Sequence, residues 1–152
     1  MSDVFSHLTE DQIIERALAI LEQRAIKGEA LTSPQTVKDL ARLKIGALEH
    51  EVFAIFYLST AHALIDFQIL FRGTIDGASV YPREVIKEAL ARNAAALIFC
   101  HNHPSGSTLP SEADRNITDR LVKAARLIDI RVLDHIIVSE RGVQSFAELG
   151  YI

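Results

Sequence analysis

The sequence predicts a single α/β (α+β) domain in which helices cover a mixed β-sheet. Two observations predict this class. Apolar residues at helical spacing alternate along the chain with short runs of branched and aromatic residues that are typical of strands. The segments come in the order two helices, two strands, a helix, a strand, a helix and two strands, which is typical of a sheet with helices packed on it. The length of 152 residues allows one domain with a substantial core and is short for two.

The composition is that of a soluble globular protein, with 49% hydrophobic and 24% charged residues. No apolar run approaches the length of a membrane span, so we expect no membrane partner. The first residues lack the basic and apolar regions of a secretory signal. Cys100 is the single cysteine, so an intrachain disulfide is excluded and we expect a cytoplasmic protein.

The net charge of −4 argues against a surface built to neutralise many phosphates. A local basic patch would escape this count, so nucleic acid stays an open partner that the charge does not support. We expect any binding to DNA to be weak and strongly dependent on salt.

The first 30 residues are expected to contain one amphipathic helix, ahead of a domain that spans residues 31–152. The helix runs from Thr9 to about Lys27. Thr9 and Gln12 fit a capping box, and Gly28 is a suitable stop. We expect its apolar stripe to pack within the chain, although the stripe could also bind a partner. The stripe consists of Ile13, Ile14, Ala17, Leu18 and Leu21.

A second helix begins at Ser33-Pro34, because serine is a good N-cap and proline suits the first helical position. Two strands follow. Residues 52–58, VFAIFYL, form a continuous apolar run that is typical of a buried strand, and residues 63–71 alternate as in a half-buried one. The short turn Ser59–His62 between them predicts a hairpin. The expected inner positions are Val37, Leu40, Ala41 and Leu48 on the helix, and Ala63, Ile65, Phe67, Ile69 and Phe71 on the second strand.

The second half of the chain alternates helices and strands. Pro82 begins a helix whose expected inner face contains Val85, Ile86, Ala89 and Leu90. The segments after it are a buried strand at Ala95–Cys100, a helix from Ser111 to about Ile128, a strand at Arg131–Val138 and a short strand at Val143–Phe146.

Two histidines follow the buried strand Ala95–Cys100. If the strand continues, His101 and His103 point to the same face, with their α-carbons roughly 7 Å apart. Two imidazoles placed in this way can share a metal ion at about 2.0–2.1 Å. Pro104 favours an extended backbone at His103, and Asn102 faces the other way and is a poor ligand candidate.

The helix that begins at Ser111 brings a carboxylate towards the same region. Ser111 and Asp114 stand at the N-cap and third helical positions, so they resemble a capping box with Asp in place of Glu or Gln. Taken alone, the two histidines could simply be polar residues at a strand end, and Ser111 with Asp114 could simply cap a helix. Together, two imidazoles and one carboxylate leave a fourth tetrahedral position for water, which is the open arrangement of a catalytic zinc site.

The string H-N-H, seven residues, S-E-A-D resembles the JAMM motif, His-x-His-x7-Ser-x2-Asp, of the JAB/MPN metallopeptidases. The flanking sequence FRGTIDGASVYPREVIKEALARNAAALIFCHNHPSG resembles the RadC family within that group. The resemblance covers about residues 31–152 and implies an MPN/JAB-like domain. It also implies a zinc-dependent hydrolase of peptide or isopeptide bonds, with a peptide or protein substrate. The zinc ligands would be His101, His103 and Asp114, and Ser111 would lie near the scissile carbonyl.

The family also implies a catalytic glutamate at the start of an upstream strand. Glu51 stands there, and Glu49 is the second candidate because it lies further from the strand. A zinc hydrolase needs a base that takes a proton from the attacking water and returns it to the leaving group. Without the resemblance, Glu51 reads equally well as an exposed residue between a helix and a strand.

Other metal enzymes fit the sequence less well. The HNH nucleases carry three residues spread over a longer ββα unit, not a contiguous tripeptide. Zinc deaminases need a P-C-x-x-C motif, which one cysteine cannot supply. Two histidines and a carboxylate also suit non-haem Fe(II), but the oxygenases that use this set are usually all-β.

The remaining polar candidates carry weaker patterns. His135 is expected to share a strand face with Leu133 and Ile137, as a core histidine or one that supports a ligand. Cys100 should point away from His101 and act as a small buried hydrophobe. The residues without a supporting pattern are His50, His62 and Arg72, although the arginine could meet a substrate carboxylate.

Longer members of the RadC family carry an N-terminal helix-hairpin-helix region of the kind that contacts DNA. The segment before Leu31 is expected to be one amphipathic helix without such a hairpin, so these residues do not support a role in DNA repair. Two functions stay open: a zinc metallopeptidase, or a non-hydrolytic DNA-associated or scaffold protein with a structural metal. The sequence leaves the oligomeric state undetermined.

Overall fold

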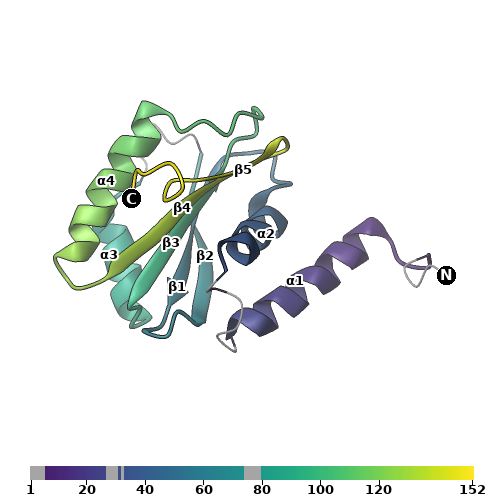
Figure 1. The fold of residues 1–152 in the computed structure, drawn as a ribbon, viewed down its shortest axis with the longest axis horizontal. Helices are drawn as coiled ribbons and strands as arrows, with labels where there is room; N and C mark the ends of the chain where they lie inside the picture. The colour runs from purple at the N-terminus through teal and green to yellow at the C-terminus, as the bar shows by residue number, and fades with distance from the viewer. Residues whose placement is uncertain (1–5, 27–30, 32, 74–79) are drawn as a thin grey trace.

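The structure is a computed structural model that describes residues 6–26, 31, 33–73 and 80–152 (Figure 1). The described residues form an α/β domain whose elements follow the predicted order, which confirms the fold class. The expected helix end at Lys27 and Gly28 lies outside the described residues. The helices are α1 (Glu10–Ile26), α2 (Pro34–Ile45), α3 (Pro82–Ala91) and α4 (Glu112–Arg126). The strands are β1 (Val52–Leu58), β2 (Leu64–Arg72), β3 (Ala96–Asn102), β4 (Arg131–Ser139) and β5 (Gly142–Ser145).

The described strands form one mixed sheet in the order β2-β1-β3-β4-β5. β1 and β2 form the predicted antiparallel hairpin, β1 is antiparallel to β3, and β3 is parallel to β4. β5 then pairs antiparallel with β4. Because β1 runs opposite to β3, the start of β1 lies beside the end of β3, with Phe53 opposite His101.

Helices cover both faces of the sheet, with α2 on one side and α3 and α4 on the other (Figure 1). Every residue of β1 and β3 is buried, which explains the uninterrupted apolar runs Val52–Leu58 in β1 and Ala96–Cys100 in β3. The core on the α2 side includes Leu40, Ala41, Ile45, Ala54, Phe56, Ile98 and Cys100. The core on the α3 and α4 side includes Phe53, Ile55, Val85, Ala89, Phe99, Ile117 and Leu121.

Strand β2 departs from the predicted alternation. Phe53 pairs with Phe71 and Ala54 with Ile69, so Leu70 is an extra residue in a β-bulge. An extra residue moves the following side chain to the other face. Ile69 therefore packs against the α2-side core and Phe71 against the opposite one, and the prediction that they share a face is wrong. The pairing shifts again between Tyr57 and Leu58, and Ile65 is 44% exposed, so the prediction that Ile65 is an inner position is wrong as well.

Strand β4 contains a similar irregularity, where its pairing with β3 shifts between Leu97 and Ile98. Leu133 packs against the α2-side core. His135 instead contacts Phe99 on the opposite side of the sheet. The prediction that Leu133 and His135 share a face is wrong, because the bulge reverses the alternation before the histidine.

The helix starts follow the sequence closely. The Thr9 and Gln12 side chains accept hydrogen bonds from each other's backbone N–H groups, at 3.2 and 2.9 Å, which confirms the capping box of α1. Ser33 occupies the N-cap of α2, but its side chain makes no capping hydrogen bond. Leu90 is 59% exposed, so the prediction that it lies on the inner face of α3 is wrong.

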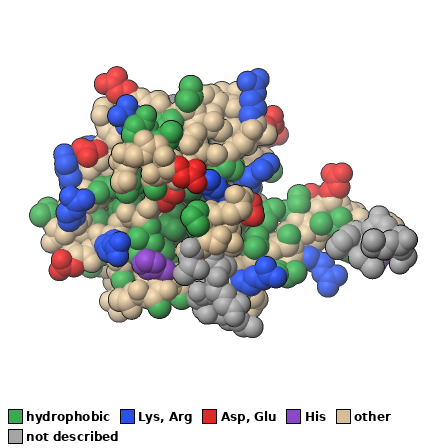
Figure 2. Space-filling view, viewed as in Figure 1, with side chains coloured by type: hydrophobic (Ala, Val, Ile, Leu, Met, Phe, Trp, Pro, Cys, Tyr) green, Lys and Arg blue, Asp and Glu red, His purple; other side chains and the backbone are tan. Residues whose placement is uncertain are grey.

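Helix α1 extends from the body of the domain (Figure 1). Leu18 and Leu21 pack against the core, which confirms intramolecular packing for part of the stripe, whereas Ile14 is 44% exposed. On the face seen in Figure 2, apolar side chains lie open along this helix, and basic and acidic side chains are interspersed over the body. Within the described residues, no helix combines the length and apolarity that crossing a membrane requires.

Candidate metal centre

The end of β3 brings the two predicted histidines together. His101 lies within β3 and is fully buried, and His103 follows the strand. The His103 N–H still donates to the Val138 carbonyl of β4 at 2.8 Å, so the extended geometry continues to this residue. The Nε2 atoms of the two rings are 2.8 Å apart, as expected of side chains that share a face.

Asp114 reaches the same point from the first turn of α4. The Ser111 N–H donates to Asp114 Oδ2 at 2.8 Å, and the Asp114 N–H donates to Ser111 Oγ at 3.0 Å, which confirms the capping box. The same carboxylate places Oδ1 at 3.3 Å from His101 Nε2 and Oδ2 at 3.2 Å from His103 Nε2. Asp114 therefore caps the helix and faces both imidazoles at once.

Glu51 enters the site from the start of β1, as the antiparallel pairing with β3 requires. Its Oε1 lies 4.0 Å from His103 Nε2. Glu51, His101 and His103 each offer one ligand atom within 4.8 Å of the others. Glu49, the second candidate for the catalytic glutamate, is exposed and lines a neighbouring cavity. Of the two glutamates, Glu51 is the one that lies beside the histidines.

The electrostatics of the site favour a positive charge between Asp114 and the two histidines. Burial acts to raise the pKa of Asp114, but hydrogen bonds from His101, His103 and the Ser111 N–H, together with the charge of His101, hold this pKa well below its usual range. The hydrogen bond to Asp114 raises the pKa of His103, against the opposing effect of burial. Asp114 is therefore an ionised carboxylate with only 2% of its surface exposed.

The outer nitrogens of both rings are also occupied. His103 Nδ1 lies 2.7 Å from the Ser107 carbonyl, which can only accept, so Nδ1 donates and the neutral ring keeps its lone pair on Nε2. His101 Nδ1 lies 2.6 Å from His135 Nε2. Both Nε2 atoms are thus directed at the space beside Asp114.

These donors fit a small divalent cation. Four ligands placed tetrahedrally at about 2.0–2.1 Å lie about 3.3 Å from each other. The contacts among His101, His103 and Asp114 are 2.8, 3.2 and 3.3 Å. Two imidazole nitrogens and a carboxylate are ligand types that zinc takes in proteins. The residues are therefore compatible with an ion of this size.

Comparison with known proteins identifies the family. The model of the RadC-like JAB domain matches residues 31–151. The chain belongs to this family. A UPF0758 protein of Vibrio cholerae serotype O1 is 54% identical over 143 residues, which cover 94% of this chain and 90% of the relative. The UPF0758 protein YfjY of Escherichia coli K12 is 49% identical over 146 residues, which cover 95% and 91%. A longer UPF0758 protein of Leptothrix cholodnii is 50% identical over 140 residues, 92% of this chain and 63% of its own length.

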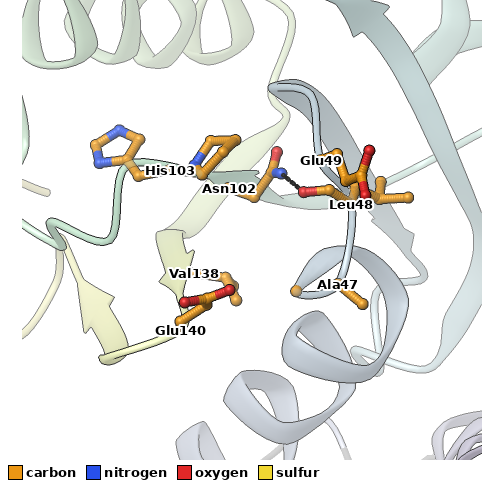
Figure 3. A pocket seen from close by; sticks show the side chains of 9 residues that line it. Ala47, Leu48, Glu49, Asn102, His103, Val138 and Glu140 are labelled. Carbon is orange, nitrogen blue, oxygen red and sulfur yellow. Dashed lines mark hydrogen bonds between the residues drawn. The ribbon is translucent and has the colours of Figure 1, made fainter.

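A cavity of about 240 Å³ opens beside His103 in this RadC-like domain (Figure 3). Glu49 and Glu140 lie on different sides of it. Asn102 forms part of the wall but has little freedom to move. Its amide nitrogen donates to the Leu48 and His50 carbonyls, and its Oδ1 accepts from the Val52 N–H. These bonds tie the segment that carries Glu51 to the end of β3.

Several further predictions concern the surroundings of the RadC-like centre. Cys100 is buried in the α2-side core and burial raises the pKa of its thiol, as expected for a small hydrophobe. His135 is fully buried and contacts His101, so it supports a candidate ligand as predicted. Burial lowers the pKa of His135, which keeps its ring neutral. Arg72 is exposed and contacts His50 at 3.3 Å, outside the centre.

Two residues of this network were missed in the sequence. Thr118 lies one turn after Asp114 and contacts His135 at 2.6 Å, and Ser107 orients His103 through its backbone carbonyl. A threonine four residues after a candidate ligand, on the same helix face, is the one signal that could have identified Thr118.

Replacing Ser111 with alanine should lower the free energy of unfolding by about 1 kcal/mol, because the Asp114 N–H loses its acceptor at the start of α4. Chemical denaturation of the metal-free protein measures this. Ser105→Ala, in the exposed loop before α4, is the matched control and should unfold as the wild type does. Equal midpoints for Ser111→Ala and Ser105→Ala would contradict a stabilising cap.

Proposed function

We propose that this RadC-like JAB domain is a zinc-dependent hydrolase of peptide or isopeptide bonds. One observation carries the proposal. Two buried or half-buried imidazoles direct their Nε2 atoms at an ionised carboxylate 3.2–3.3 Å away, and a second carboxylate stands 4.0 Å from one of them. A pair of ring nitrogens and two acids in this arrangement supplies both the ligands and the base of a zinc hydrolase.

In this proposal His101, His103 and Asp114 hold the zinc. Asp114 is a better ligand than Glu51 because its oxygens approach both Nε2 atoms more closely. A zinc ion held there would act as a Lewis acid and lower the pKa of a water molecule at its open position. Glu51 then keeps an unligated carboxylate, which a proton carrier requires.

Glu51 serves as the general base and acid. Its carboxylate takes a proton from the attacking water and delivers it to the leaving nitrogen of the substrate. The backbone of Glu51 is fixed because its carbonyl accepts the Gly73 N–H at 2.8 Å. The carboxylate itself stays reachable, since 19% of the side chain is exposed.

Ser111 is proposed to stabilise the oxyanion. Its hydroxyl oxygen accepts the Asp114 N–H, so the hydroxyl proton is available to a substrate oxygen. Ser111 is exposed at the N-terminus of α4, where the helix dipole also favours negative charge. The hydroxyl and the helix N-terminus would therefore both stabilise the negative charge of the oxyanion.

A peptide or protein is the substrate class that we propose, and the cavity beside His103 is a place for a residue next to the scissile bond. We also propose that the reaction takes place in the cytoplasm, since a single buried cysteine is typical of proteins of a reducing compartment. The net charge of −4 gives no support to nucleic acid as the substrate.

A library of peptides and lysine-linked isopeptides tests the proposed function. Zinc-reconstituted protein should cleave at least one member, lose the activity with a chelator and regain it when zinc is added back. His101→Ala should be inactive under the same conditions, because it removes a proposed ligand. If wild-type protein with a full complement of zinc cleaves no member, the hydrolase proposal is contradicted and a scaffold with a structural metal becomes the better account.

A further inference from the structure

A buried chain of hydrogen bonds runs behind the metal-facing histidines. It passes from His101 Nδ1 to His135 Nε2 at 2.6 Å, and from His135 Nδ1 to Thr118 Oγ1 at 2.6 Å. Thr118 Oγ1 then contacts the backbone carbonyl of Asp114 at 2.7 Å. All four residues are at most 2% exposed. The chain thus begins at one proposed zinc ligand and ends at another.

The chemistry of the end groups fixes the direction of every bond in this chain. The Asp114 carbonyl can only accept, so it takes the single hydroxyl proton of Thr118. Thr118 Oγ1 must then accept from His135 Nδ1–H. A neutral His135 is left with its lone pair on Nε2, which accepts from Nδ1–H of His101.

The surroundings of His135 favour the neutral ring and fix its orientation. The ring stacks on Phe146, with centroids 4.4 Å apart, and meets Phe53 and Phe99 edge-on at 5.6 and 5.9 Å. An apolar environment of this kind disfavours a charged ring. The His135 N–H also donates to Asp134 Oδ1 at 2.7 Å, which holds the backbone.

We propose that His135 and Thr118 are positioning residues that hold His101 in the tautomer whose Nε2 lone pair binds the metal. The inference rests on the metal-binding half of the proposed function. Because the chain ends on the Asp114 backbone, it also fixes the first turn of α4 relative to β3. The two residues therefore set both the protonation pattern of His101 and the position of Asp114.

Zinc affinity, measured by competition with a chromophoric chelator, tests the proposal. Thr118→Val keeps the side-chain shape but removes the acceptor for His135 Nδ1–H. His135 can then carry its proton on Nε2 and donate to His101 Nδ1, which moves the His101 proton to the nitrogen that must bind zinc. Thr118→Val should bind zinc about 10–100-fold more weakly than wild type.

Two variants control for a purely structural effect. Thr118→Ser restores the hydroxyl and should recover an affinity close to that of wild type. Ile117→Val removes one methylene from the neighbouring buried position of α4, where the side chain belongs to the α3 and α4-side core, and should bind zinc as wild type does. A third variant, His135→Phe, is a second test of the proposal and not a control. It keeps an aromatic ring without nitrogens and should weaken zinc binding as Thr118→Val does.

Cobalt substitution adds a second readout, because the visible d–d spectrum reports the geometry of the bound ion. Thr118→Val should change this spectrum and Ile117→Val should not. The positioning role of Thr118 and His135 would be overturned if Thr118→Val bound zinc as tightly as Ile117→Val and left the cobalt spectrum unchanged. Wild-type protein that binds zinc but cleaves nothing would contradict the hydrolase proposal alone, and wild-type protein that binds no zinc would overturn both.

Discussion

Glu51→Gln should slow hydrolysis by about 10²–10⁴-fold, the usual contribution of a general base. Glutamine keeps the size and hydrogen-bonding capacity of the side chain but cannot accept and return a proton at pH 7. Since Glu51 lies further from the Nε2 atoms than Asp114 does, the variant should retain the zinc content of wild type. The paired measurement is the zinc content and the rate on a substrate that wild type cleaves.

The exposed Glu15 of α1 provides the matched control, because Glu15→Gln makes the same chemical change on the helix that extends from the body of the domain and should leave the rate unaltered. If Glu51→Gln cleaves as fast as wild type, the assignment of the base is wrong and Glu49 becomes the candidate. If Glu51→Gln loses its zinc, Glu51 is a ligand, and the division of roles between the two carboxylates is wrong.

Asp114→Ala should reduce bound zinc from about one ion per chain to a small fraction of that, as expected when one of three protein ligands is removed. His101→Ala should have the same effect. Asp114→Asn separates ligation from capping, because its amide oxygen can still accept the Ser111 N–H while the negative charge is lost. Elemental analysis after zinc reconstitution and removal of free metal measures the content of each variant.

Ser111→Ala is the control for these ligand variants, since it removes the other half of the capping box and should keep its zinc. Asp114→Ala that retains one zinc per chain would contradict the proposed ligand set. Wild-type protein without bound metal after reconstitution would contradict the zinc site as a whole.

The strands and the metal-facing residues were the parts most open to prediction from sequence. β1 and β3 are covered on both faces, so each must present apolar side chains in both directions, and the resulting uninterrupted run is visible in the sequence. The contacts of His101, His103 and Asp114 arise mainly from local geometry. An i, i+2 pair on extended backbone shares a face, and a capping box fixes the third helical residue.

The bulges were not predictable, because an extra residue in a strand is defined only by its pairing partner. Leu70 and Leu133 follow the same alternation as their neighbours in the sequence, and the register of β1 and β3 decides which side chains change face. His135 shows the consequence most clearly. Its burial was predicted, but its expected face-sharing with Leu133 was wrong.

Glu51 and Thr118 show how tertiary contacts limit such predictions. Glu51 was identified through the family resemblance, and its approach to His103 depends on the antiparallel pairing of β1 with β3. Thr118 was missed because its partner His135 lies 17 residues further along, on a different element. No local pattern connects the two residues.

The central claim is that one zinc ion is held by His101, His103 and Asp114 while Glu51 stays unligated. Anomalous diffraction at the zinc edge, from crystals of the zinc-reconstituted protein, tests it most directly. The account predicts a single peak at about 2.0–2.2 Å from both Nε2 atoms and an Asp114 carboxylate oxygen. No peak at this position, or a peak with Glu51 in the place of Asp114, would contradict it.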